Sequence, residues 1–225
     1  KGPPLVELLE NLEKNEDHLS IRPFLMPIQW VNRPNPNFRG VSGRIVNGNI
    51  SVNEKVSISS SHKTTTVDRI IAPKGDVDTG LEGQSVTITF SDDVDCCRGD
   101  ILSNENTLLE TADQFEVTII WMDINELIPG RPYYIRIGSD EASATLAIPK
   151  YKMNIETNEQ IATKSFSLND IGTTVMTLDK SISFVSYKEN RDLGGFILID
   201  KFSNQSVATG LINFALRRSQ NIQWQ

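Results

Sequence analysis

The side chains best suited to chemistry stand apart from one another in this sequence. The thiols of Cys96 and Cys97 are adjacent, and the two histidines, His18 and His62, lie in polar stretches far apart. Adjacent cysteines rarely reach disulfide geometry without strain. Their spacing relative to the histidines matches no zinc signature, and a Cys–His catalytic pair would need distant segments to meet. We interpret the cysteines as two thiols at a strand end.

The acidic run SDDVD, Ser91–Asp95, has the carboxylates of a cation site without its frame. Calcium loops space their ligands, turn at a glycine and end in a distal Glu, so a solvated loop is the better interpretation. The tripeptide RGD at Arg98–Asp100 precedes ILS, and we expect it to be a turn that leads into the last strand of a first domain.

Nucleotide and acyl-transfer motifs are missing from the whole sequence. It contains no G-x-x-x-x-G-K-[ST], no G-x-G-x-x-G after a strand and no G-x-S-x-G. The glycines of GLEGQS, Gly80–Ser85, lack the lysine of a phosphate-binding loop and are interpreted as a turn. We therefore expect no catalytic residue, cofactor site or metal site in this chain.

Three segments combine basic, amide and aromatic side chains. The stretch WVNRPNPNFRG, Trp30–Gly40, suits a ligand loop, a nucleic-acid contact or a corner of a β-fold. The stretch GRPYYIRIG, Gly130–Gly138, can stack a base or hold an anion, and its alternation also suits a half-buried strand. In Tyr187–Asp200 a polar loop precedes a buried strand, so Asn190 and Arg191 are either functional loop residues or turn residues.

The whole-chain properties restrict the class of protein. A length of 225 residues allows one large or two ordinary domains, and 22 basic against 29 acidic residues give a net charge of −7. This balance disfavours a general nucleic-acid binder, and no apolar run reaches the length of a membrane span. The first residue is not methionine and no signal-peptide pattern follows. We expect a fragment or processed piece of a cytoplasmic protein with reduced thiols.

One helix and many strands are expected to position these residues. Leu5, Leu8, Leu9 and Leu12 form one apolar stripe at helical spacing, which we expect to pack toward the core rather than bind a partner. The remaining chain is typical of short strands separated by turns. The turn NGN at Asn47–Asn49 predicts a hairpin.

The strands fall into two series, with a domain boundary near Asn106. The expected strands are Phe24–Val31, Gly43–Val46, Lys55–Ser59, Thr65–Ile71 and Ser85–Phe90, then Phe115–Trp121, Tyr133–Ile137, Glu141–Ile148, Lys150–Ile155, Lys164–Leu168, Thr173–Leu178, Phe196–Asp200 and Ser206–Phe214. This pattern predicts an all-β chain with two antiparallel barrels or sandwiches behind a short helix.

The sequence also resembles a known family. RPFLMPIQWV followed by FRGVSGRIVNGNISVNEKVSI is similar to the second domain of translational GTPases of the elongation factor Tu type. The segment between Arg39-Gly40 and Gly43-Arg44 is shorter than in translation factors, and Asn53-Glu54 replaces their usual GD or GE turn. These departures disfavour handling of tRNA.

The closer resemblance is to the large, GTPase-bearing subunit of bacterial ATP sulfurylase (sulfate adenylyltransferase subunit 1). The motifs that carry it are VNRPN..FRG at Val31–Gly40, F.....WM at Phe115–Met122, L.PGR.Y at Leu127–Tyr134, NDIG at Asn169–Gly172 and Y..NR..G.FILID at Tyr187–Asp200. The tail FALRRSQNIQWQ, Phe214–Gln225, resembles the joint of the form that is fused to adenylylsulfate (APS) kinase.

The resemblance implies a domain layout. Residues 1–19 would end an upstream GTPase domain, 20–106 and 107–216 would be consecutive antiparallel β-barrels of the translation-GTPase domain II and domain III types, and 217–225 would lead to the kinase.

The resemblance also implies a non-catalytic coupling and docking module in GTP-driven synthesis of adenylylsulfate from ATP and sulfate. GTP and Mg would be bound by the missing upstream domain. The partners would be the small catalytic subunit and the chain's own GTPase and APS kinase domains, with no nucleic acid and no membrane. The alternative is a fragment of a translation-type GTPase that binds aminoacylated RNA.

Six residues are candidates for contact with partners. They are Arg33, Phe38, Arg39, Arg131, Asn190 and Arg191. We expect Trp30–Gly40 to form a long connection between the first two strands of the first barrel, stiffened by its prolines and anchored by Phe38. The alternative for Arg33 and Arg39 is that both pair with local carboxylates.

Overall fold

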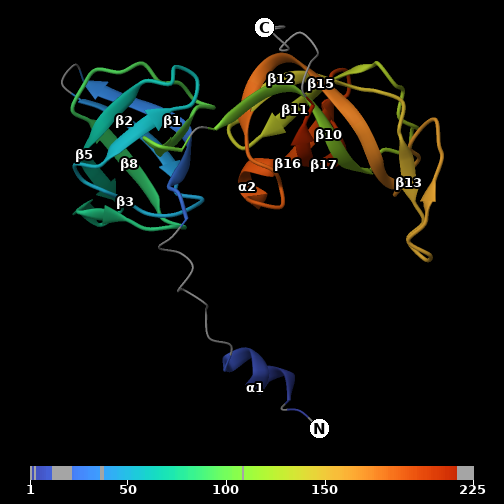
Figure 1. The fold of residues 1–225 in the computed structure, drawn as a ribbon, viewed down its shortest axis with the longest axis horizontal. Coiled ribbons are helices and arrows are strands. Elements are labelled where there is room, and N and C mark those ends of the chain that lie inside the picture. Colours follow the sequence, from blue (N-terminus) through green and yellow to red (C-terminus); the bar gives the residue numbers. More distant parts are fainter. Residues whose placement is uncertain (1, 3, 12–21, 36–37, 108, 217–225) are drawn as a thin grey trace, which may run out of the picture.

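The computed structural model describes residues 2, 4–11, 22–35, 38–107 and 109–216 (Figure 1). The elements run in the order α1 (Leu5–Glu10), β1 (Leu25–Asn35), β2 (Phe38–Arg44), β3 (Ile50–Ser51), β4 (Lys55–Ile58), β5 (Thr64–Ala72), β6 (Gly75–Val77), β7 (Thr79–Gly80), β8 (Ser85–Phe90), β9 (Ile101–Asn104), β10 (Glu110–Trp121), β11 (Pro132–Ile137), β12 (Asp140–Leu146), β13 (Tyr151–Met153), β14 (Gln160–Ile161), β15 (Ile171–Phe184), α2 (Arg191–Gly194), β16 (Gly195–Asp200) and β17 (Ser206–Ala215).

The first barrel closes through antiparallel strands in the order β4-β9-β1-β2-β8-β5, and β5 pairs back to β4. Strand β6 extends the sheet beyond β5, and β3 pairs with β7. Alternation along SVTITF of β8 turns Val86 and Ile88 into the core. Closure leaves no free edge among the six barrel strands. The predicted all-β fold with two antiparallel barrels is thus confirmed for its first half.

The second barrel follows the order β10-β17-β16-β11-β12-β15, and β15 pairs back to β10. The hairpin of β13 and β14 is added to β15 outside the closed ring. In β11 the residues Tyr133, Ile135 and Ile137 face inward and alternate with exposed neighbours. The largest buried side chains in its core include Phe115 and Trp121. The barrel prediction is confirmed here as well.

Three local predictions were wrong. Asn47–Asn49 turns with Gly48 at φ +62°, but its flanking strands β2 and β3 join different partners, so no hairpin forms. The turn is instead held by Leu25, whose N–H donates to the carbonyl of Asn47 at 2.9 Å. Lys164–Leu168 is an irregular connection rather than a strand. Trp30–Gly40 is mostly strand, because β1 runs to Asn35 and β2 begins at Phe38.

The predicted helix forms as α1, but its apolar stripe has no partner among the described residues. Leu5, Leu8 and Leu9 are exposed, and no residue of α1 is buried. The expected packing of the stripe toward a core is therefore not found among the described residues, and Leu12 lies outside them. No helix in the described ranges is long and apolar enough to cross a membrane.

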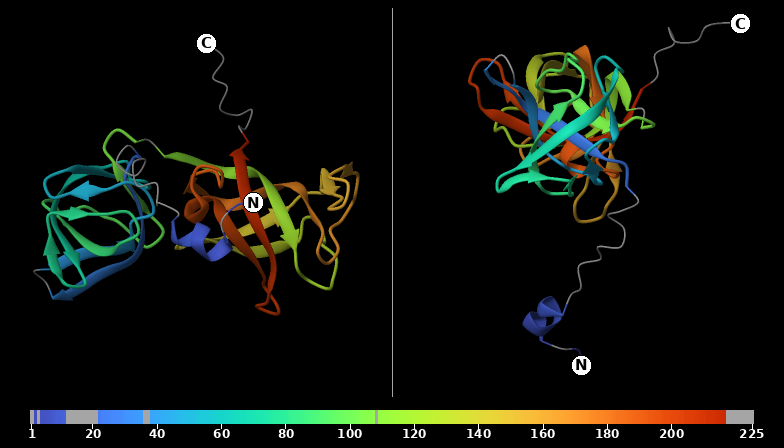
Figure 2. Two further views of the ribbon diagram at one scale, coloured as in Figure 1. Left: turned by 90° about the horizontal axis from the view of Figure 1, so that it is seen from below. Right: turned by 90° about the vertical axis from the view of Figure 1, so that its left-hand side faces the viewer.

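The two barrels contact each other along one edge and lie one behind the other in the right-hand view of Figure 2. Leu25 and Ile101 of the first barrel form a buried apolar cluster with Leu193 of α2. Two hydrogen bonds cross the same junction, from Ser139 Oγ to the carbonyl of Ile28 at 2.8 Å and from Asn190 Nδ2 to the carbonyl of Val46 at 3.1 Å. We call these contacts the interbarrel junction.

Candidate functional site

The tip of the β1–β2 pair carries the first group of candidates. Asn35 pairs with Phe38, which places Arg33 and Arg39 on neighbouring strands beside the acidic loop 91–95. Arg39 donates to Asp93 at 2.5 Å and to Asp95 at 3.4 Å. Arg33 lies 3.8 Å from Asp93. Both arginines therefore have local carboxylate partners, as in the alternative interpretation, although only Arg39 is held closely.

A hollow of about 500 Å³ lies beside this tip. Its walls mix guanidinium, carboxylate and aromatic groups, which come from Arg33, Asn35, Phe38, Arg39, Asp68, Arg69, Thr89, Phe90, Ser91, Asp92 and Asp93. Its hydroxyls, Thr89 and Ser91, donate to the carboxylates of Asp68 and Asp92 at 3.2 and 3.3 Å. Among the described residues it holds no set of metal ligands. Such a surface suits polar contact with another protein better than catalysis.

Arg33→Ala and Arg39→Ala are expected to differ in their effect on the melting temperature, which shows which arginine stabilises the fold. The Arg39 side chain is 20% exposed against 56% for Arg33, and its buried Nε has no partner in the described chain. Arg39→Ala should lower the melting temperature because it removes a mostly buried side chain and its close ion pair with Asp93, whereas Arg33→Ala should leave it within about 1 °C. Differential scanning fluorimetry measures both. Equal losses would contradict the distinction between the two arginines.

Asn190 belongs to the interbarrel junction. Its side chain accepts from the N–H of Leu193 at 3.0 Å, capping α2, while its amide donates across to Val46. Gly194 permits this close packing, because a Cβ there would lie 2.2 Å from the backbone nitrogen of Tyr187. Arg191 is exposed on α2. The structure thus gives Asn190 a structural position and leaves Arg191 available for contact.

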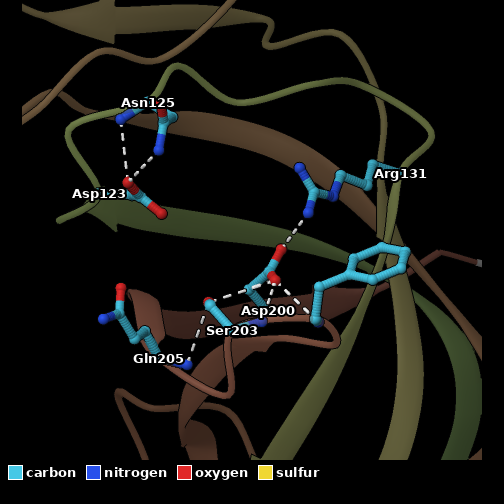
Figure 3. A network of polar contacts seen from close by, with 7 residues as sticks. Asp123, Asn125, Arg131, Asp200, Ser203 and Gln205 are labelled. Carbon is cyan, nitrogen blue, oxygen red and sulfur yellow. Dashed lines mark hydrogen bonds and ion pairs between the residues drawn. The ribbon is translucent and has the colours of Figure 1, made fainter.

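Arg131 lies in a polar network on the connection between β10 and β11 (Figure 3). Its guanidinium binds the carboxylate of Asp200 and lies 5.4 Å from the ring centre of Phe202. The same carboxylate accepts from the N–H groups of Phe202 and Ser203 at 2.8 and 2.9 Å. These backbone hydrogen bonds, above all that of Ser203, hold the pKa of Asp200 below its ordinary value.

The cysteines do not form a reactive pair in this arrangement. Both are free thiols, with Cys96 buried and Cys97 exposed. Burial raises the pKa of the Cys96 thiol, so its nucleophilic thiolate is disfavoured at neutral pH. Among the described residues, no group of His, Cys, Asp and Glu is arranged to hold a metal ion. Because the sequence also lacks a phosphate-binding loop, this chain's residues do not fit a GTP–Mg site.

Apart from Asn190, the residues of the interbarrel junction were not found from the sequence. Ser139 follows a glycine turn and Leu193 lies in RDLGG, and neither pattern differs from an ordinary loop. The only signal was the run of turn residues around Asn190, which was ambiguous. Contacts that join positions as distant as Ile28 and Ser139 depend on how two barrels dock, and local patterns carry no information about docking.

The second barrel matches a known family, and the pair of barrels matches a solved structure. Residues 114–213 match the family described as GTP-eEF1A C-terminal domain-like. A crystal structure of sup35 complexed with GDP superposes with a TM-score of 0.81 at 19% identity, covering 96% of this chain and 53% of that one. The second barrel is therefore similar to the GTP-eEF1A C-terminal domain-like family, and the pair of barrels has the fold of the matching part of sup35.

Three proteins with higher sequence identity match nearly the whole chain. The chain is 39% identical over its whole length to the bifunctional enzyme NodQ of Rhizobium sp. (strain BR816) and covers 35% of that protein. It is 35% identical to the bifunctional enzyme CysN/CysC of Xylella fastidiosa, covering 100% of this chain and 36% of that protein. For sulfate adenylyltransferase subunit 1 of Methylorubrum extorquens (strain PA1) the identity is 35%, over 96% of this chain and 46% of that protein.

The resemblance expected from the sequence motifs is confirmed by these homologues. The chain spans between about a third and a half of the length of these relatives.

Proposed function

We propose that the chain is the non-catalytic coupling and docking module of a sulfate-activating enzyme. The observation that carries the proposal is the similarity, over essentially the whole chain, to proteins named sulfate adenylyltransferase subunit 1, CysN/CysC and NodQ. In the parent protein, GTP hydrolysis drives synthesis of adenylylsulfate from ATP and sulfate, and the adenylyl transfer takes place on a small catalytic subunit.

The parent protein is proposed to be cytoplasmic and to bind GTP and Mg in a domain upstream of this chain. Residues 1–19 end that domain, 20–106 and 107–216 are the two barrels, and 217–225 lead to an APS kinase domain. The absence of a phosphate-binding loop from the printed sequence supports this division of labour. The segments 12–21 and 217–225 lie outside the described residues.

Coupling requires a body that transmits the nucleotide state of one domain to a partner. The closed barrels supply stiff surfaces, and the interbarrel junction joins them through Leu193, Asn190 and Ser139. A movement imposed on the first barrel is then passed to the second as a rigid displacement. The candidate contact residues Arg33 and Arg191 lie on different barrels and so offer two separate places for docking.

A binding experiment tests this proposal. The chain is expected to bind the purified small subunit of ATP sulfurylase from the same source in biolayer interferometry and to give no heat with GTP–Mg in calorimetry. Tight GTP binding by this chain would contradict the division of labour, and failure to bind the small subunit would contradict the docking role. Filter binding to aminoacylated tRNA that weakens steeply with salt would instead favour a translation-type factor.

A further inference from the structure

We propose that the end of the second barrel remote from the first is a docking surface for a separate protein chain. The partner is one whose contact face is apolar and bordered by basic side chains. The surface consists of Met122, Ile124, Ile128, Leu168 and Phe202, and we call it the distal apolar surface. The inference rests on the proposed function and names the place where its docking occurs.

The exposure of these side chains is the first observation. Ile124 and Phe202 are each 83% exposed, and the other three are between 42% and 54% exposed. They come from three connections, namely β10–β11, the segment before β15 and the β16–β17 turn. An isolated exposed leucine needs no explanation, but large apolar side chains gathered at one end of a soluble domain mark an interaction site.

Hydrogen bonds bring these connections together and fix them. The N–H of Leu127 donates to the carbonyl of Phe166 at 2.9 Å, and that of Asn169 donates to Trp121 at 2.8 Å, so the first two connections are joined. The N–H of Met122 donates to the carbonyl of Val207 at 2.8 Å, next to the third. A surface that is already ordered loses little conformational entropy when it binds.

Arg131 fixes the remaining apolar side chain. It joins the β10–β11 connection to the β16–β17 turn through Asp200, and its guanidinium lies 5.4 Å from the Phe202 ring centre. An exposed aromatic ring without such support would sample several rotamers. Arg131 is therefore a positioning residue for Phe202 on this surface, which gives this candidate a role in docking without direct contact.

The path of the chain favours a separate polypeptide as the occupant. Arg22 and Pro23 at the start of the barrels and Phe214 and Ala215 at their end line one groove at the interbarrel side. Strand β17 runs from Ser206, next to the distal turn, to Ala215, a distance of about 30 Å at ~3.3 Å per residue. Flanking domains of the same chain therefore attach at the opposite end of the second barrel.

The charges favour a different protein over a second copy. The β10–β11 connection carries Asp123 and Glu126 beside Ile124 and Ile128. Of the basic residues in the three connections, Arg131 is bound to Asp200 and Lys201 donates to Ser143 Oγ at 2.6 Å, which leaves Lys164. Two copies docked through this surface would oppose like charges in a chain of net charge −7. A partner with basic side chains around an apolar face fits the same surface.

The test compares a double variant with a matched control. Ile124→Ser with Phe202→Ser removes the two most exposed side chains, and Ile155→Ser removes an aliphatic group that is also mostly exposed, on the β13–β14 hairpin. The probe is the purified small subunit of ATP sulfurylase, measured by biolayer interferometry. The double variant should bind at least tenfold more weakly, and the control should bind as the unaltered chain does. Equal melting temperatures verify that all variants fold.

Each contrary outcome has a distinct meaning. If the unaltered chain binds the small subunit and the double variant binds equally well, the distal surface is overturned and the proposed function stands. If the unaltered chain does not bind, the proposed function and this inference are both overturned. Dimers in light scattering that the double variant abolishes would assign the surface to a second copy and overturn the separate partner.

Discussion

Leu193→Asp is expected to split the thermal unfolding of the chain into two calorimetric transitions. Leu193 is 3% exposed and packs against Leu25 and Ile101 of the other barrel. An aspartate there would bury a charge without a partner, which costs several kcal/mol, and would lose about 2 kcal/mol of apolar burial. Separation of the barrels exposes the aspartate to water and so removes the penalty of the buried charge. Because each barrel has its own core, each should then unfold independently.

The control is Leu81→Asp, which places the same carboxylate on an exposed position of the first barrel. It should leave the number of transitions unchanged. Under the proposed function, coupling should fail together with the junction, so Leu193→Asp in the parent protein should lower GTP-dependent adenylylsulfate synthesis and leave GTP hydrolysis intact. A single transition with unchanged midpoint in Leu193→Asp would show that the barrels are joined by something other than this cluster.

Strands with one buried face were predictable because apolar and polar residues alternate within each segment. Ser85–Phe90 was predicted with the bounds that the structure gives, since Val86 and Ile88 alternate with polar residues. Strand β15 was predicted only as Thr173–Leu178, but it continues to Phe184 through Asp179, Lys180 and Ser181. Those polar residues lie at a register shift, beyond which Ile182–Phe184 pair again with β10, and these partners lie some seventy positions earlier. Local propensity does not contain that pairing.

The error at Lys164–Leu168 has a physical cause. Phe166 is fully buried, so the segment has the apolar signal of a strand. Its backbone, however, bonds to the β10–β11 connection, and Ser165 Oγ donates to the carbonyl of Leu127 at 2.6 Å. These bonds satisfy the backbone without a ladder. Sequence patterns predict burial better than they predict the partner that accepts each hydrogen bond.

The charged part of the candidate site could be predicted from the sequence, whereas the distal apolar surface could not. Arg33 and Arg39 were found by composition, and their carboxylate partners lie in the acidic run that was predicted to be a loop. The distal apolar surface was not found, because exposed Ile124 and Phe202 look like core residues until the barrel closes. Exposure is a property of the whole fold, whereas charge and turn chemistry are properties of the segment.

Asp200→Ala is expected to destabilise the second barrel by about 3 kcal/mol, because several polar groups lose one buried acceptor. The carboxylate accepts from Phe202, Ser203 and Arg131 and is only 8% exposed. Asp200→Asn keeps the size and one acceptor oxygen, so its cost should be about half as large. Urea denaturation measures both variants. Equal, near-zero costs would contradict a stabilising network.

The pH dependence gives an independent check on the same carboxylate. The folded pKa of Asp200 is lowered, first by the backbone hydrogen bond from Ser203 and further by Phe202 and Arg131. A lowered folded pKa stabilises the protein above the unfolded value of about 3.9 and ceases to do so as pH falls through the folded pKa. The stability difference between the unaltered chain and Asp200→Asn should therefore be constant from pH 5 to 7 and shrink below about pH 4.

Binding of the small subunit tests whether the contacts of Asp200 and Arg131 serve docking as well as the stability of the turn. Asp200→Asn loses the charge and one of the two oxygens that hold Arg131 and the Phe202 turn. It should therefore weaken binding of the small subunit even at temperatures where the barrel is fully folded. Arg131→Lys keeps the charge but loses the planar guanidinium beside the Phe202 ring, and it should weaken binding with little loss of stability. If both variants bind normally while folded, the turn serves the barrel alone.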